Sequence, residues 1–94
     1  MTGNINYIIV EFILQLYCDI LPHGENYFTI ATEINVPKDQ EYLIFDFLIQ
    51  HKLIEKYEYN ESKHVITGNG INAVTSNCGI ENYLRSQISH ANKL

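Results

Sequence analysis

Apolar residues near the start of the chain recur at intervals of three or four positions. Because this spacing is typical of one face of an α-helix and Asn4 can cap its first turn, the pattern predicts a helix over residues 4–21. Glu11, Gln15 and Asp19, each four positions apart, form only a narrow polar stripe. A helix with so little polar surface needs apolar neighbours on more than one side, and a second copy of the chain is a natural source of one.

The next part of the chain predicts two further helices, separated from the first by a turn that contains a proline and a glycine. Residues 27–29 have the composition of a short strand. A short helix follows over residues 29–35, with Thr29 as its N-cap. Pro37 suits the first turn of a longer helix, which we predict over residues 38–52.

The spacing changes after this helix, from helical to alternating. The alternation, a polar turn and a returning strand predict an antiparallel β-hairpin over residues 53–67. A short helical stretch follows at 71–76, and an amphipathic helix is predicted over residues 79–91. These elements make one domain over residues 1–94, mainly α with a small antiparallel β-hairpin, of the α+β class.

Three short segments carry a resemblance to a known family. Thr29–Val36 looks like a short second helix and its turn, Lys52–Lys56 like the end of a recognition helix entering a wing, and Val65–Gly70 like a wing strand ending in Leu-Thr-x-x-Gly. With the order of elements, these segments resemble the winged-helix family, and within it the multiple-antibiotic-resistance and phenolic-acid-response regulators. The resemblance implies a winged helix-turn-helix with a C-terminal helix, in which residues 38–52 are the recognition helix and residues 53–67 the wing.

The resemblance also implies a function. Regulators of this family bind double-stranded DNA as homodimers, so the chain is expected to be a DNA-binding transcriptional regulator or accessory factor. The DNA contacts implied are Lys38, Gln40, Tyr42, Lys56, Asn60, Lys63 and His64. The expected dimer or partner interface comprises Ile8, Phe12, Ile80, Tyr83, Leu84 and Ile88. The C-terminal residues among these could instead pack within their own chain, but the resemblance favours the dimer, since terminal helices of related regulators often dimerise.

Charge favours a second interpretation. The chain has 6 Lys+Arg against 11 Asp+Glu, a net charge of −5, whereas DNA binding draws most of its affinity from cations. On the recognition-like helix, the positions expected to point outward are apolar or acidic: Tyr42, Leu43, Asp46 and Phe47. The alternative is a protein–protein interaction module on a winged-helix scaffold that does not bind DNA and buries Tyr42, Leu43 and Phe47 against a protein partner.

Catalytic and metal chemistry find no support in the sequence. The four histidines lack ligand spacing, and no glycine-rich phosphate loop or nucleophile–base pair is present, so we expect no enzyme activity, no metal and no cofactor. Residues 5–21 are too short to span a bilayer and carry acidic residues, so no membrane association is expected. Two unpaired cysteines, Cys18 and Cys78, fit reduced thiols and a cytoplasmic location better than a disulfide.

Overall fold

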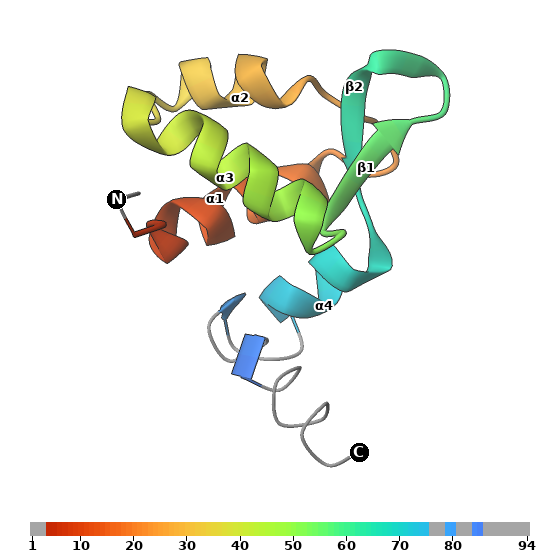
Figure 1. The fold of residues 1–94 in the computed structure, drawn as a ribbon. Coiled ribbons are helices and arrows are strands. Elements are labelled where there is room, and N and C mark those ends of the chain that lie inside the picture. Colours follow the sequence, from red (N-terminus) through yellow and green to blue (C-terminus); the bar gives the residue numbers. More distant parts are fainter. Residues whose placement is uncertain (1–3, 76–78, 81–83, 86–94) are drawn as a thin grey trace.

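The computed structural model describes residues 4–75, 79–80 and 84–85 (Figure 1). Within them the prediction of a mainly helical chain with one antiparallel hairpin is confirmed. The hairpin stands at one end of the first three helices, and α4 follows it (Figure 1). The elements in chain order are α1 Tyr7–Asp19, α2 Tyr27–Glu33, α3 Lys38–Gln50, β1 Ile54–Tyr57, β2 Asn60–Ile66 and α4 Gly68–Thr75.

The first helix begins later than the sequence suggested. Asn6, not Asn4, is the N-cap of α1, because its side-chain oxygen accepts hydrogen bonds from the backbone N–H groups of Ile8 and Ile9 at 3.0 and 3.3 Å. The backbone carbonyl of Asn4 instead accepts a hydrogen bond from Gln40 Nε2 at 3.0 Å. The start of α1 is therefore fixed both by its own cap and by a side chain of α3.

The second helix also differs from its prediction, at its N-terminus. Asn26 caps α2 by accepting from the Thr29 N–H at 3.1 Å, so the predicted strand at 27–29 and the predicted Thr29 cap are both wrong. Strand-like pairing occurs two residues earlier, where the backbones of Glu25 and His64 exchange hydrogen bonds of 2.8 and 2.9 Å. This bridge attaches the α1–α2 connection to the hairpin.

The hairpin is antiparallel and in register from its open end, with Ile54 opposite Ile66 and Lys56 opposite His64. The register shifts once, between Lys56 and Tyr57. Thr67 then starts α4, since its hydroxyl oxygen accepts the Gly70 N–H at 3.0 Å. Of the predicted helix at 79–91, most positions lie outside the described residues.

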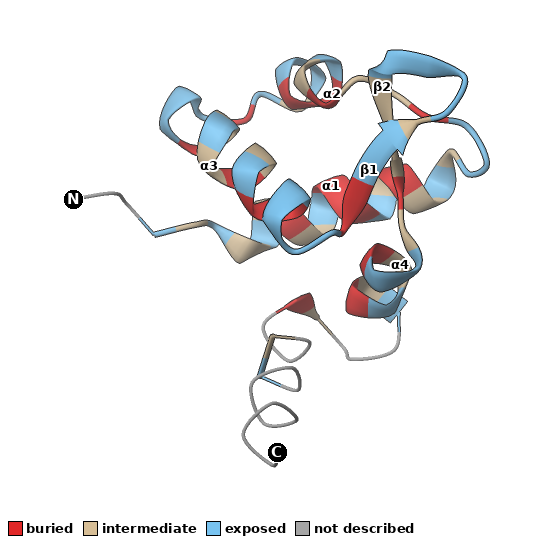
Figure 2. Cartoon of the chain, turned by 45° about the vertical axis from the view of Figure 1, so that its right-hand side comes forward, coloured by how far each residue is buried: buried red, intermediate tan, exposed pale blue. Residues whose placement is uncertain are grey.

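The buried side chains of the helices and the hairpin form one core, which appears as red segments facing inward in Figure 2. Helix α3 contributes Ile44, Phe47 and Leu48 to it, together with Gln40. Phe47 was expected to point outward but is only 8% exposed, because it lies on the same stripe as Ile44 and Leu48. The apolar core comprises Val10, Ile13, Leu14, Tyr17, Tyr27, Ile30, Ala31, Val36, Ile44, Phe47, Leu48, Leu53, Ile54, Ile66, Ala73 and Ile80.

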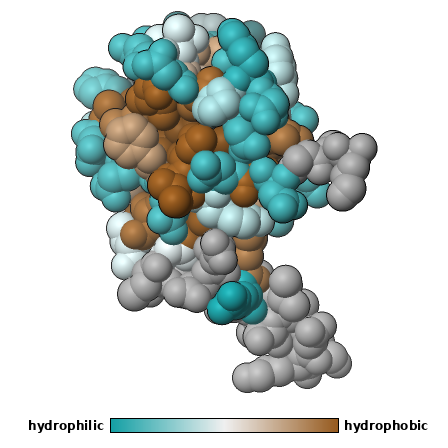
Figure 3. All heavy atoms as spheres, turned by 90° about the vertical axis from the view of Figure 1, so that its left-hand side faces the viewer, coloured by the Kyte–Doolittle hydropathy of each residue, from teal (hydrophilic) through white to brown (hydrophobic). Residues whose placement is uncertain are grey.

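Apolar residues also gather on the surface. Figure 3 looks onto the side of the molecule where α1 begins and the α2–α3 turn lies, and it shows a patch of hydrophobic residues there. Ile8 and Phe12, on α1, are 79% and 51% exposed. A second group of exposed apolar side chains lies on α3, where the resemblance placed the DNA-reading surface.

Candidate interaction surface

Helix α3 is apolar on two sides. Its buried stripe faces the core, whereas Tyr42, Phe45 and Ile49 occupy positions i, i+3 and i+7 on another side. Tyr42 is 64% exposed, Ile49 is 41% exposed and Phe45 is half-buried between them. We call this second stripe the outer face of α3. Phe45 packs against the core from this side, whereas Tyr42 and Ile49 remain largely exposed to solvent.

Aromatic rings connect the outer face to the neighbouring elements. The ring of Phe45 lies with its centroid 5.0 Å from that of Phe28 and 5.3 Å from that of His64. Phe28, on α2, also lies 5.2 Å from the exposed Tyr42 ring. Rings at these separations attract one another beyond the area they bury, so the cluster holds α2, α3 and β2 in a fixed arrangement.

A groove of about 430 Å³ runs between the outer face of α3 and the hairpin. Phe45, Ile49 and Ile54 supply its apolar surface. Lys52 and Lys56 supply positive charge and Glu55 negative charge, and His64 and Thr67 complete the lining. We call this the α3–hairpin groove. An apolar hollow with a few polar groups at its margin is the usual form of a recognition site.

The imidazole ring of His64 lines this groove, and one of its two nitrogen atoms is buried without a hydrogen bond to any described residue. Its Nδ1 atom is buried and has no hydrogen-bond partner within the part of the chain that the structure describes. Burial lowers the pKa of the imidazole, and the positive charge of Lys56 on the facing strand lowers the pKa further. The ring is therefore neutral near pH 7, when it contributes no charge to the groove.

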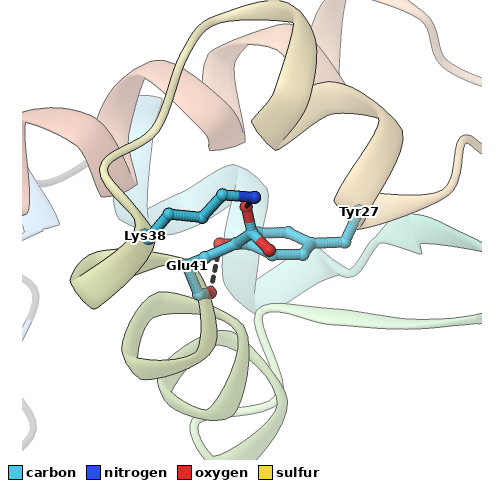
Figure 4. Close-up of polar contacts among 3 residues, drawn as sticks. All are labelled: Tyr27, Lys38 and Glu41. Carbon is cyan, nitrogen blue, oxygen red and sulfur yellow. Dashed lines mark hydrogen bonds and ion pairs between the residues drawn. The ribbon is translucent and has the colours of Figure 1, made fainter.

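The start of α3 carries one exposed cation. The Lys38 side chain is 93% exposed, and its Nζ lies 4.0 Å from Glu41 Oε2 (Figure 4). Figure 4 also shows the Tyr27 hydroxyl donating to the backbone carbonyl of Glu41, at 2.7 Å. Asp39 and Asp46 are exposed along the same helix. Negative charge thus accompanies the apolar stripe, and it would repel the phosphates of a bound duplex.

The residues implied as DNA contacts differ in how far they are exposed to solvent. Gln40 is buried and bonds to Asn4 and Asn6, so it cannot reach a base edge, and this part of the prediction is wrong. Lys56 and Asn60 are exposed on the hairpin, and Lys63 is half-buried there. The Asn60 side-chain oxygen accepts from the Ser62 N–H at 3.0 Å and from its hydroxyl at 2.7 Å, at the start of β2.

The residues implied as a dimer interface also differ in their burial. Ile80 is fully buried in the core of its own chain, where its N–H donates to Glu11 Oε1 at 2.7 Å, so it is unavailable to a partner and its assignment is wrong. Leu84 is partly buried against the same core. Ile8 and Phe12 are exposed on α1. Tyr83 and Ile88 lie outside the described residues.

Phe28, Phe45 and Ile49 were missed as surface residues by the sequence analysis. Phe45 and Ile49 follow Tyr42 at helical spacing, so a search for a second apolar stripe on the predicted helix would have found them. Phe28 could not be found this way, because it was placed in a strand instead of in α2.

No helix in the described part of the chain is both long and apolar enough to cross a membrane. Among residues 4–75, 79–80 and 84–85, no group of three or more His, Cys, Asp or Glu side chains could hold a metal ion. A comparison of the chain with protein-family models, curated proteins and solved structures found no match.

Proposed function

We propose that the chain is a protein-binding module on a winged-helix scaffold, and that the α3–hairpin groove with the outer face of α3 is its binding site. The observation that supports this most directly is the exposure of Tyr42 and Ile49 on α3, the helix for which the family resemblance implies a recognition role. Base edges and phosphates are recognised by cations and amides, whereas this helix presents aromatic and aliphatic groups.

The partner segment that suits the groove is apolar. Phe45 and Ile49 would lose contact with water when covered, and this burial favours binding by about 25 cal/mol per Å² of apolar surface. Lys52 and Lys56, at the margin of the groove, favour acidic groups at the ends of the segment. Tyr42 supplies an amphipathic ring, a residue type enriched at protein interfaces.

A selection of random peptides displayed on phage tests the proposal. The full chain is immobilised, and selected peptides are re-tested against Ile49→Asp and against Gln50→Asp, its neighbour on an exposed position of the same helix. We expect peptides with apolar anchor residues whose binding is lost with Ile49→Asp and kept with Gln50→Asp. Circular dichroism melting confirms that both variants fold. The proposal is contradicted if no peptides are selected, or if the selected peptides bind Ile49→Asp as well as they bind the wild-type chain.

The DNA-binding regulator implied by the family resemblance is the competing outcome. Fluorescence anisotropy with a mixed-sequence DNA duplex at low salt separates the two functions. We expect no binding by the wild-type chain. Salt-sensitive binding that disappears when Lys56 and Lys63 are both replaced by Glu would instead support the DNA-binding function and overturn ours.

A further inference from the structure

The sequence contains one asparagine that is followed by glycine, and this pair, Asn69 and Gly70, lies in the first turn of α4. An asparagine side chain can react with the backbone nitrogen of the next residue. Most residues hinder this attack with their Cβ atom, which glycine lacks. Every other asparagine of the chain precedes a residue that has a Cβ atom. Asn69 is therefore the asparagine that the sequence leaves most open to this reaction.

Packing against the hairpin requires the glycine of this pair. A Cβ atom at position 70 would collide with the backbone carbonyl oxygen of Leu53 and lie 2.5 Å from Ile66 Cγ1. Asn69, in contrast, is exposed to solvent, so water can reach its side-chain amide. The contact that joins α4 to the hairpin thus keeps a reactive pair at the surface of the molecule.

The reaction is loss of the side-chain amide nitrogen, and its only co-reactant is water. The backbone nitrogen of Gly70 attacks Cγ of Asn69, so an N–Cγ bond forms and the Cγ–Nδ2 bond breaks. The side-chain nitrogen leaves as ammonia and takes the proton of the Gly70 N–H. Water then opens the resulting five-membered imide at either of its two carbonyl groups, which gives aspartate or isoaspartate. Nothing is oxidised or reduced in either step.

The folded first turn of α4 opposes this reaction in two ways. The Gly70 N–H donates to the Thr67 hydroxyl oxygen at 3.0 Å, and that hydroxyl in turn donates to the Lys52 carbonyl at 2.6 Å. The attacking nitrogen is therefore engaged with an anchored side chain. The imide ring also requires Asn69 Cβ and Gly70 N to be nearly eclipsed about the Cα–C bond, whereas a helical ψ of about −42° keeps them apart. Ring closure thus requires this turn to open.

Helix α4 is built to open at low cost. It has 8 residues, which is shorter than helices that are stable alone, and Gly68 and Gly70 weaken its first turn further. Its buried residues are Gly70 and Ala73, and segments with so few buried contacts open locally without global unfolding. We propose that Asn69 is a site of spontaneous deamidation, that local opening of α4 sets its rate, and that the Thr67 hydroxyl holds the site closed.

The two products act differently on α4. Aspartate only adds a carboxylate to the first turn of a helix, where the helix dipole favours negative charge. Isoaspartate routes the main chain through the side chain of residue 69 and so adds one backbone carbon before Gly70. Because Gly70 already lies in close contact with Leu53 and Ile66, this extra atom disrupts the packing of α4 against the hairpin.

Peptide mapping by mass spectrometry tests the site. The full chain is incubated at mildly alkaline pH, both folded and unfolded in guanidinium chloride, and the gain in mass at residue 69 is followed with time. We expect conversion at Asn69 in both samples, with the folded chain slower. Asn69→Gln should show no conversion at this position, because its longer side chain would have to close a six-membered ring. No conversion at Asn69 in the folded chain, or equal rates in the two samples, would overturn the proposal.

Three variants test the role of Thr67 in the folded chain. Thr67→Val removes the hydroxyl and should speed conversion at Asn69 about fivefold, the equivalent of about 1 kcal/mol for a lost helix cap. Thr67→Ser keeps the hydroxyl and should convert at the wild-type rate. Thr75→Val, which removes the hydroxyl bonded to the Ile71 carbonyl at the other end of α4, should do the same. Circular dichroism melting sets an incubation temperature at which every variant is folded, and all should convert alike in denaturant. A folded Thr67→Val chain that converts no faster than wild type contradicts the role of the hydroxyl.

Discussion

The side-chain oxygen of Gln40 accepts a hydrogen bond from the backbone N–H of Asn6 at 2.9 Å. These residues are 34 positions apart, and Gln40 is the buried polar residue of the described core. The other end of the same amide donates to the Asn4 carbonyl at 3.0 Å. One side chain on α3 thus forms hydrogen bonds with two backbone groups just before α1. A side-chain amide suits this position because its oxygen accepts a hydrogen bond while its nitrogen donates one.

Replacing Gln40 with Leu should destabilise the fold. Leu removes both hydrogen bonds and leaves the Asn6 N–H and the Asn4 carbonyl without this partner, at a cost of about 1–3 kcal/mol. Denaturant unfolding followed by circular dichroism measures the change. Gln50→Leu, at an exposed position of the same helix, is the control and should change stability by less than about 0.5 kcal/mol. Equal effects of the two substitutions would contradict a structural role for the Gln40 amide.

The sequence predicted the helices and the hairpin because their signals are local. Apolar spacing in α1 and alternation around Ile54 depend only on neighbouring residues. Helix starts were less predictable: Asn4 and Asn6 can both cap a helix, and so can Asn26 and Thr29. The choice depends on which side chain the folded chain leaves free to accept.

The sequence predicted that α3 is a helix more easily than it predicted which side of α3 faces the core. Because the helix has two apolar stripes, spacing alone does not say which stripe faces the core, and Phe47 was assigned to the wrong side. Gln40 looked like a surface residue because glutamine usually is one. Its burial follows from the distant backbone groups of Asn4 and Asn6, which no local pattern reveals.

Gly70 should be needed where α4 meets the hairpin. A Cβ added at this position would collide with the backbone carbonyl oxygen of Leu53 and lie 2.5 Å from Ile66 Cγ1. Since a backbone carbonyl cannot move aside cheaply, Gly70→Ala should cost about 1–3 kcal/mol. Gly68→Ala is the matched control in the same helix, because nothing lies within 4 Å of its added Cβ. We expect that variant to be unchanged or stabilised by up to about 1 kcal/mol, by helix propensity. Thermal melts of both proteins give the comparison, and a loss in Gly68→Ala alone would refute the packing argument.

Tyr27→Phe should weaken the attachment of α2 to α3. The substitution keeps the buried ring, which lies 5.0 Å from Phe45, and removes only the hydroxyl that donates to the Glu41 carbonyl. The expected loss is about 1 kcal/mol in the free energy of unfolding. Tyr59→Phe makes the same chemical change at a ring that is 78% exposed and should have no measurable effect. A neutral result for Tyr27→Phe would mean that this hydrogen bond contributes nothing to stability.

Burial of His64 should make stability depend on pH. Burial, and secondly the charge of Lys56, depress the pKa of its imidazole below the unfolded value of about 6.5. Between those two pKa values the unfolded chain binds more protons than the folded chain, so stability falls as the pH falls. The contribution of neutral His64 is complete above about pH 6.5 and is lost progressively below it. His64→Phe keeps a ring against Phe45 and removes this titration, so its melting temperature should fall less than that of the wild-type chain between pH 7.5 and pH 5.5. His23→Gln, at an exposed position, serves as the control, and an identical pH dependence in wild type and His64→Phe would show that His64 does not contribute.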